Sequence, residues 1–272
     1  MYNKNMKNET NTDNIIPLPR YPKHDDFAIL SPCFYFNPIK TQTVLKKEFS
    51  KVGNNGIPFI EYGSQEEFTN KIYTHIIRLH EELEKLDPKY RHVIVMDSYD
   101  TIYLGGNTIL EMLQRYRNQA EKKPMVVLAS EKECYPEGSQ IYYKEKLPSY
   151  LNAGLMIGEA HLIKTILSQM IKDYDLNIYK TVNDKTINHH QILWHRYINE
   201  GILNKCIYID YLNEFFYCMN NCEPEKDMEY VNHIKIRIKS TGNIPKLFHY
   251  NRCFSDGTKE KFYRFYMKHN EG

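Results

Sequence analysis

Short apolar segments alternate with segments of helical periodicity over the first 170 residues of this chain. Short apolar runs of this kind are typical of strands that are buried on both faces, as in parallel sheets. The segments between them carry apolar residues three or four positions apart, which indicates amphipathic helices that cover the sheet. The alternation therefore predicts an α/β fold with a mainly parallel sheet flanked by helices.

The same pattern gives approximate bounds for the expected elements. Strands are predicted at residues 27–30, 57–60, 92–96, 125–129, 155–157 and 207–209. Helices are predicted at residues 68–83, 109–116 and 162–170. The later segments 234–238 and 246–249 could add strands to the same sheet. Residues 1–25 are expected to form a disordered or extended leader, and residues 26–272 a single folded domain.

The charge balance and the absence of long apolar runs exclude several functional classes. Lys and Arg number 36 against 34 Asp and Glu, so the net charge of +2 gives no footprint for nucleic acid. No apolar run approaches the roughly 18 residues that a membrane span needs, and the N-terminus lacks the apolar core of a signal peptide. The glycine-rich motifs of dinucleotide sites and P-loops are also absent.

The cysteines are scattered along the chain. There are six of them in a chain long enough to fold without cross-links, which favours free thiols over a disulfide framework. Cys218, Cys222 and Cys253 could form a zinc site together with His249. No CxxC pair is present, however, and this weakens the zinc interpretation.

The most informative segment is HVIVMDSYD, residues 92–100, in which a predicted strand leads directly into two carboxylates. A turn at the end of the strand would let Asp97 and Asp100 converge, and converging carboxylates repel unless a cation lies between them or one is protonated. Oxygen ligands suit Mg²⁺ or Mn²⁺, and an added imidazole favours Mn²⁺. Alternatively, this is a polar loop in which Asp100 is a cap or turn residue.

Three further segments, taken with this carboxylate pair, resemble one family in order and spacing. They are ASEKECYP at 129–136, YLNAGLMIG at 150–158 and LFHYN at 247–251. Over residues 26 to about 262 the chain resembles the glycosyltransferase domain of the multifunctional procollagen lysyl hydroxylases and, more distantly, the procollagen galactosyltransferases. It also resembles stand-alone giant-virus relatives of that domain, in agreement with its content of Asn, Lys, Ile and Tyr.

The resemblance implies a GT-A glycosyltransferase fold for residues 26–272, a UDP-sugar donor and a Mn²⁺ ion that bridges the diphosphate of the donor. By matching motif, Asp97, Asp100 and His249 would be the metal ligands. The alternative for His249 is a core histidine at a strand end.

The resemblance also implies residues that bind the donor. Tyr99, between the two carboxylates, would stack on uracil, and Asn251 would contact the donor. Lys71 would lie near the nucleotide, and Lys259 is a candidate for binding the diphosphate. The two lysines could instead be ordinary surface residues, and Tyr99 an exposed loop residue.

Asn152 and Gly154 are assigned to the pocket for the acceptor or the donor sugar. Glycine permits close approach of a bound sugar, and asparagine supplies both a donor and an acceptor group. The alternative is that the two residues form a turn ahead of a strand.

The chain departs from the family at the start of a predicted helix. Where the family has an acidic run followed by Gln, residues 188–194 read NHHQILW. His189 and His190 therefore occupy the place of the acids and are included among the candidate catalytic residues. They could accept hydrogen bonds as neutral imidazoles, or they could simply belong to the helix N-terminus. The family also has Trp where Tyr135 stands, which makes this aromatic platform smaller.

These observations favour a retaining transfer of glucose from UDP-glucose to galactosyl-hydroxylysine of a collagen-like polypeptide. An inverting enzyme ordinarily needs a carboxylate base, and residues 188–191 offer none. The alternatives are transfer of galactose from UDP-galactose to hydroxylysine and a catalytically weak UDP-sugar-binding protein. Since no segment after residue 262 could hold an oxygenase, a separate lysyl hydroxylase is expected to act upstream. If the protein is viral, its expected location is the host cytoplasm or a virus factory.

Overall fold

The computed structural model describes residues 25–33, 57–63, 73–98, 100–105, 108–136, 139, 149–174, 180–182, 185–187, 189–201, 203–250 and 257–269. Apart from Asp25, the predicted leader lies outside these ranges. No helix within them is both long and apolar enough to cross a membrane.

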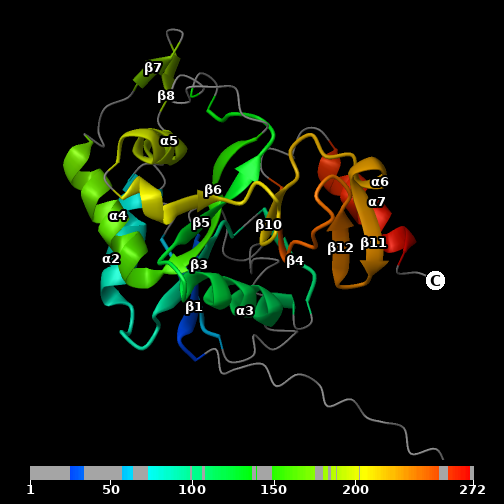
Figure 1. Ribbon diagram of the computed structural model, residues 1–272. Coiled ribbons are helices and arrows are strands. Elements are labelled where there is room, and N and C mark those ends of the chain that lie inside the picture. Colours follow the sequence, from blue (N-terminus) through cyan, green and yellow to red (C-terminus); the bar gives the residue numbers. More distant parts are fainter. Residues whose placement is uncertain are drawn as a thin grey trace, which may run out of the picture.

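A six-stranded sheet forms the centre of the structure (Figure 1), with the strand order β2-β1-β3-β6-β5-β9. Its strands are β1 (Phe27–Pro32), β2 (Phe59–Tyr62), β3 (His92–Met96), β5 (Val126–Glu131), β6 (Tyr150–Glu159) and β9 (Ile207–Ile209). β6 is antiparallel to both of its neighbours, whereas the other three strand pairs are parallel. The prediction of a mainly parallel α/β sheet is therefore confirmed, with β6 as a reversed strand.

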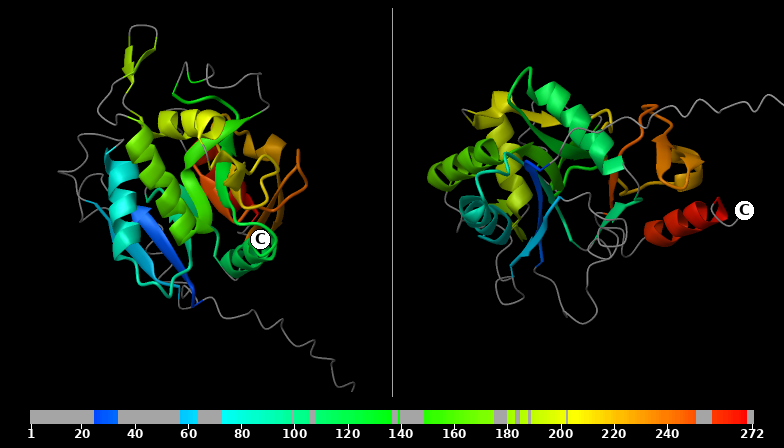
Figure 2. Two further views of the ribbon diagram at one scale, coloured as in Figure 1. Left: turned by 60° about the vertical axis from the view of Figure 1, so that its left-hand side comes forward. Right: turned by 90° about the horizontal axis from the view of Figure 1, so that it is seen from below.

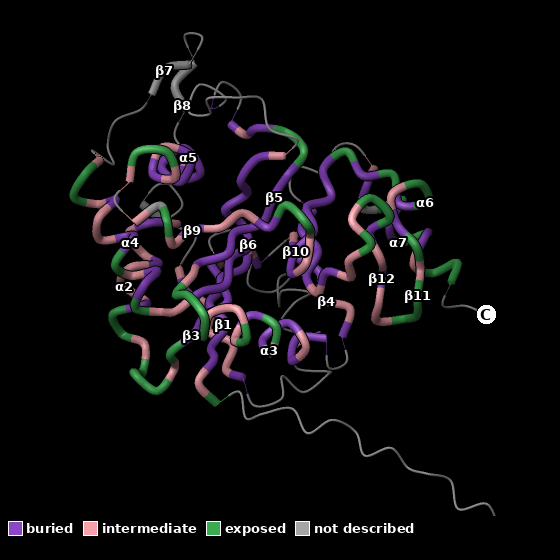
Figure 3. Tube along the Cα trace, viewed as in Figure 1, coloured by how far each residue is buried: buried purple, intermediate pink, exposed green. Residues whose placement is uncertain are grey.

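Helices cover both faces of this sheet (Figure 2). α2 (Arg78–Lys85), α4 (Ala160–Asp173) and α5 (His190–Glu200) pack on one face, and α3 (Thr108–Ala120) packs on the other. A π-helical turn, η2 (Tyr73–Ile77), precedes α2. Each face of the sheet therefore has its own hydrophobic core, the first beneath α2, α4 and α5 and the second beneath α3. Along β3, Val93 and Val95 belong to the first core while Ile94 and Met96 belong to the second, because successive side chains of a strand point to opposite faces. Figure 3 shows the inner strands of this sheet buried, and β1, β3 and β5 are buried at every residue, whereas the edge strands β2 and β9 are only partly buried.

A second, smaller sheet adjoins the central one and has the order β10-β13-β4. It consists of β4 (Thr101–Tyr103), β10 (Phe216–Cys218) and β13 (Leu247–His249). β11 (Met228–Asn232) and β12 (Lys235–Ile238) form a separate hairpin beside the helices α6 (Pro224–Asp227) and α7 (Thr258–Lys268). The remaining described elements are the hairpin of β7 (Lys180–Val182) and β8 (Lys185–Ile187) and the short 3₁₀ turn η4 (Asn204–Cys206).

The suggestion that segments 234–238 and 246–249 extend the central sheet is wrong. The first forms the hairpin strand β12, and the second forms β13 of the smaller sheet. The physical reason is a third core, in which Ile236 and Ile238 pack with Phe248 and with Phe262 of α7. Buried and partly exposed residues alternate along β12, which suits a hairpin with one face towards solvent rather than a central strand that is buried on both faces.

Candidate active site

The two aspartates and the histidine of the predicted metal site come together where the two sheets meet. Asp97 directly follows β3, Asp100 directly precedes β4, and His249 is the last residue of β13. One ligand atom from each lies within 4.8 Å of the others. Among the residues that the structure describes, no other group of three or more acidic, histidine or cysteine side chains could hold an ion in this way. We call these three residues the metal group.

Main-chain hydrogen bonds fix the backbone on either side of the metal group. The N–H of Asp97 donates to the carbonyl oxygen of Gly154 in β6 at 2.9 Å, and the N–H of Tyr250 donates to the carbonyl oxygen of Asp100 at 2.6 Å. His249 is paired in register with Thr101, the residue that follows Asp100. The two carboxylates are therefore positioned by strand pairing rather than by a free loop.

The imidazole of His249 is buried between the carboxylates, with only 2% of the residue exposed. Its Nε2 lies 3.2 Å from Asp100 Oδ1 and 3.5 Å from Asp97 Oδ2, yet it makes no hydrogen bond of acceptable geometry. A buried ring nitrogen that faces two carboxylate oxygens without a hydrogen bond fits a divalent cation in the space between them. An imidazole and two carboxylates are also ligands that Mn²⁺ accepts.

Electrostatics within the metal group agree with a cation site. Burial alone lowers the pKa of His249, but the charge of Asp100 outweighs it and holds this pKa well above its usual range. Burial likewise raises the pKa of Asp100, but the charge of His249, with a smaller contribution from His75, lowers it overall. The carboxylates thus favour positive charge on the imidazole, and a divalent ion bound between them would supply positive charge in place of the proton.

Asn152 and Gly154 lie against the metal group and inside β6, so the alternative of a turn ahead of a strand is wrong. A Cβ at Gly154 would overlap His249 Cε1 and lie 2.7 Å from Asp97 Oδ2. Leu128 and Ala129 of β5 pair with Met156 and Asn152 respectively, so residues 153–155 form a bulge in β6. Bulges of this kind re-aim side chains next to functional sites.

The cysteines near His249 do not support the zinc interpretation. Cys218 Sγ lies 3.9 Å from His249 Nδ1, and Cys222 Sγ accepts a hydrogen bond from the hydroxyl of Tyr217. Burial raises the pKa of Cys218 to about 11 and that of Cys222 to about 12, so both remain neutral thiols at physiological pH. Cys253 lies outside the described residues.

Comparison with known proteins identifies the family. The family described as PLOD GT domain matches residues 67–257, which is most of the chain. The chain belongs to the PLOD GT domain family. The predicted resemblance to the glycosyltransferase domain of the procollagen lysyl hydroxylases is thereby confirmed, and the α/β architecture of the chain is that of a GT-A glycosyltransferase. No curated protein sequence matches the chain.

Three solved structures resemble the chain at low sequence identity. A glycosyltransferase involved in the glycosylation of the major capsid of PBCV-1 has 11% identity and a TM-score of 0.47, covering 87% of this chain and 98% of its own. Mouse xyloside xylosyltransferase 1, in its apo form, has 11% identity and a TM-score of 0.47, with coverages of 84% and 98%. A 4-diphosphocytidyl-2C-methyl-D-erythritol synthase from Anaerococcus prevotii has 9% identity and a TM-score of 0.35, with coverages of 69% and 89%. Since all three TM-scores lie below 0.5, the family assignment rests on the PLOD GT match alone.

His189 and His190, the two histidines at the start of α5, have different surroundings. His189 is the N-cap of α5, and its Nδ1 accepts a hydrogen bond from the N–H of Gln191 at 3.3 Å. His190 is buried and its ring stacks on His189 at 4.7 Å and on His75 of η2 at 4.1 Å. Tyr135 meets the ring of His189 edge-on. His189 therefore belongs to the helix N-terminus, as one interpretation of the sequence held, and His190 joins α5 to η2.

Gln191 is the residue at this helix start whose importance the sequence did not reveal. Its Nε2 donates towards Glu131 Oε1 at 2.7 Å and lies within hydrogen-bonding distance of the carbonyl oxygens of Tyr135 and Leu151. Its Oε1 accepts from the N–H of Ala153 at 3.1 Å, inside the bulge of β6. Gln191 thus ties α5 to β5 and to the bulge beside the metal group. The sequence did offer an indication of this role, since both Gln191 and Glu131 lie in segments that were compared with the family.

We expect Gln191→Leu to lower the free energy of unfolding by about 2–3 kcal/mol, because it leaves the buried Glu131 carboxylate and the Ala153 N–H without this partner. Gln169→Leu is the matched control, since the Gln169 amide makes only a surface hydrogen bond with Asp173. It should change stability by less than about 0.5 kcal/mol. Urea denaturation followed by circular dichroism measures both, and equal effects would contradict the role given to Gln191.

The remaining candidate residues for donor binding are not placed by the structure. Lys71, Tyr99 and Asn251 lie outside the described residues. Lys259 is the second residue of α7, and its side chain is also outside the described part. Their assigned roles remain predictions from the PLOD GT motifs.

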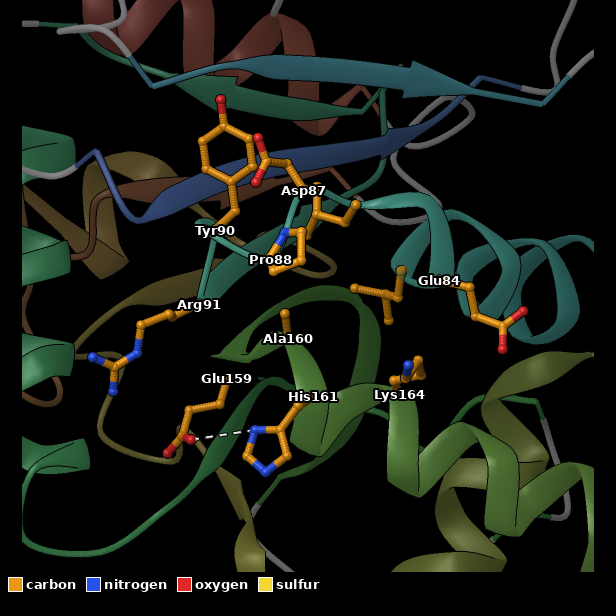
Figure 4. A pocket seen from close by; sticks show the side chains of 11 residues that line it. Glu84, Asp87, Pro88, Tyr90, Arg91, Glu159, Ala160, His161 and Lys164 are labelled. Carbon is orange, nitrogen blue, oxygen red and sulfur yellow. Dashed lines mark ion pairs between the residues drawn. The ribbon is translucent and has the colours of Figure 1, made fainter.

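A hollow of about 440 Å³ lies at the opposite end of β3 from the metal group (Figure 4). Its walls come from the end of α2, the segment that leads into β3, and the start of α4, and Figure 4 shows charges of both signs around it. Glu159 and His161 form an ion pair in its wall, with 3.5 Å between Glu159 Oε2 and His161 Nδ1. Because Arg91 lines this hollow and precedes β3 while Asp97 follows β3, the strand separates the hollow from the metal group.

Proposed function

We propose that the protein is a metal-dependent hexosyltransferase that moves glucose from UDP-glucose to galactosyl-hydroxylysine of a collagen-like polypeptide, with retention of configuration. The observation that carries the proposal is the metal group. Two carboxylates and a buried imidazole nitrogen that faces them converge at the carboxyl end of β3, in a chain of the PLOD GT family. Ligands of α/β proteins bind at this end of the strands.

The ligand set supports a metal ion that handles phosphate oxygens. Asp97, Asp100 and His249 would hold Mn²⁺, and the ion would supply Lewis-acid neutralisation of the donor diphosphate as UDP leaves. Three protein ligands leave coordination positions for the oxygens of a substrate. A binding protein that performs no transfer has no need to stabilise a leaving group, so the metal group favours an enzyme over a UDP-sugar-binding protein.

The residues around the metal group would then bind the rest of the donor. Tyr99 stands between Asp97 and Asp100 in the sequence, and stacking on the uracil of a donor whose diphosphate binds the metal is its proposed contact. Asn251 follows His249 by two positions and is proposed to contact the donor. Lys71 and Lys259 would add positive charge near the phosphates.

The choice of a retaining mechanism depends on the start of α5. An inverting enzyme needs a base on the side of the sugar opposite the leaving group. The residues at this helix start are His189, engaged as the N-cap, and His190, buried in a ring stack. In front-side attack, by contrast, the departing phosphate takes the proton of the acceptor hydroxyl. This argument favours glucose transfer to galactosyl-hydroxylysine, an acceptor that requires a lysyl hydroxylase and a galactosyltransferase to act first.

A donor screen tests this function. We expect UDP release from UDP-glucose with a galactosyl-hydroxylysine peptide in the presence of Mn²⁺, and no release above background in excess EDTA. The matched reactions use UDP-galactose and a peptide with bare hydroxylysine. Proton NMR of the product reads the anomeric coupling. A β-linked galactose on bare hydroxylysine would replace the proposed reaction with the galactosyltransferase alternative, and full activity in EDTA would contradict the role of the metal.

A further inference from the structure

The side chain of Asn152 bridges the main chain of Gly154 and the ring of His249. Its Oδ1 accepts a hydrogen bond from the N–H of Gly154 at 2.9 Å and lies 3.1 Å from His249 Nδ1. Asn152 is almost completely buried, with 4% of the residue exposed. The amide oxygen therefore contacts the side of the imidazole that faces away from Asp97 and Asp100, whereas Nε2 faces the two carboxylates.

The orientation of the Asn152 amide follows from the main chain. The N–H of Gly154 can only donate, so the atom that faces it must be an acceptor, which is the amide oxygen and not the amide nitrogen. Flipping the amide would set two donors against each other. Unlike most asparagine orientations, this one is fixed by a group whose hydrogen position is known.

The orientation of Asn152 in turn selects the tautomer of His249. An amide oxygen has no hydrogen to give, so a hydrogen bond at 3.1 Å requires the proton on Nδ1. When a cation takes the place of the Nε2 proton, an imidazole that keeps its proton on Nδ1 presents its lone pair from Nε2, the atom that faces Asp97 and Asp100. Cys218 Sγ is the other polar atom near Nδ1, but at 3.9 Å it is the more distant one.

We propose that Asn152 is a positioning residue that holds His249 in the tautomer able to bind a divalent cation through Nε2. Asn152 acts through His249 and not by direct contact with the sugar, which differs from its assignment on sequence grounds. The proposal rests on the metal-dependent function proposed above. Gly154 contributes twice, since its N–H orients Asn152 and its missing side chain leaves room for the ring.

The neighbouring structure explains how Asn152 is held in place. The bulge at residues 153–155 brings the side chain of Asn152 and the N–H of Gly154 together. Gln191 fixes the bulge by accepting the hydrogen bond of the Ala153 N–H. Partners that orient a metal-binding histidine in this way typically change metal affinity 10- to 100-fold when they are removed.

The test is Mn²⁺ affinity, measured on the full chain by isothermal titration calorimetry without nucleotide sugar. We expect Asn152→Ala to weaken Mn²⁺ binding about 10- to 100-fold. Asn152→Asp keeps an acceptor at the same place and should bind within a few-fold of the wild type. Cys218→Ala removes the other neighbour of Nδ1 and should leave affinity unchanged. Thermal unfolding of each variant identifies any that fail to fold.

A double-mutant cycle with His249→Ala separates positioning from a structural role. If Asn152 acts through His249, Asn152→Ala should add no further loss of Mn²⁺ affinity once His249 is Ala. Additive losses, unchanged affinity in Asn152→Ala, or an equal loss in Cys218→Ala would each overturn the proposal. Failure of the wild-type protein to bind Mn²⁺ would instead contradict the metal-dependent function, so the two failures are distinguishable.

Discussion

Gly154→Ala is expected to reduce metal-dependent sugar transfer by more than about 100-fold, because a misplacement of about 1 Å in a catalytic site has an effect of that size. The added methyl group would overlap His249 Cε1 and lie 2.7 Å from Asp97 Oδ2. The ring cannot move into solvent, since His249 is buried, and the strand is held by the hydrogen bond from the Asp97 N–H to Gly154 O. Overpacking should also lower stability by about 1–3 kcal/mol. A UDP-release assay and a thermal melt measure the two effects.

Gly158→Ala is the matched control, in the same strand but away from the metal group. A Cβ there would lie 3.0 Å from the terminal methyl groups of Ile163 and Val126, which are part of the ordinary core. We expect a lower melting temperature with sugar transfer retained. If the two variants lost transfer equally, the effect of Gly154→Ala would reflect the stability of β6 and not crowding of the metal group.

Asp97→Asn and Asp100→Asn are each expected to lower kcat by more than about 100-fold, since loss of the cation removes several kcal/mol of stabilisation from the transition state. Each substitution keeps the shape of the side chain and removes its charge. Both residues lie at strand ends and outside the apolar cores, so the variants should unfold cooperatively, as judged by circular dichroism.

Asp87→Asn is the control for these two variants. Asp87 is exposed and lines the hollow at the far end of β3, so its substitution should leave transfer unchanged. If Asp100→Asn kept the kcat of the wild type at saturating donor, the metal group would not be required for the reaction.

The central part of the fold could be predicted because its signal is continuous. The apolar run His92–Met96 ends at a charged residue, and the structure places β3 at the same bounds. The length of β6 was underestimated. The sequence predicts a strand at residues 155–157, whereas β6 extends over Tyr150–Glu159. Asn152 and Gly154 interrupt its apolar pattern, yet both lie within the strand, next to His249 of the metal group. The local pattern therefore fails at the point where the strand packs against the metal group.

The convergence of the three residues of the metal group could be predicted for a different reason. Asp97 and Asp100 follow a recognisable strand, so their convergence follows from local geometry, whereas His249 was included only through the family resemblance. No pattern within the three residues of β13 indicates that this strand pairs with β4 and β10. Likewise, the burial of Gln191 between two strands depends on contacts between residues far apart in the chain. Periodicity describes single elements and carries no information about such partners.

The position of the metal group at the junction of the two sheets links cation binding to the assembly of the molecule. Asp97 belongs to the end of the central sheet, whereas Asp100 and His249 border strands of the smaller one. An ion held by all three would bind only when the sheets are docked, so its binding free energy would add to the free energy of docking. At a concentration 100 times its Kd, this would amount to about 2.7 kcal/mol. The C-terminal region would therefore be held more firmly when Mn²⁺ is abundant, and resistance to unfolding would vary with the metal supply.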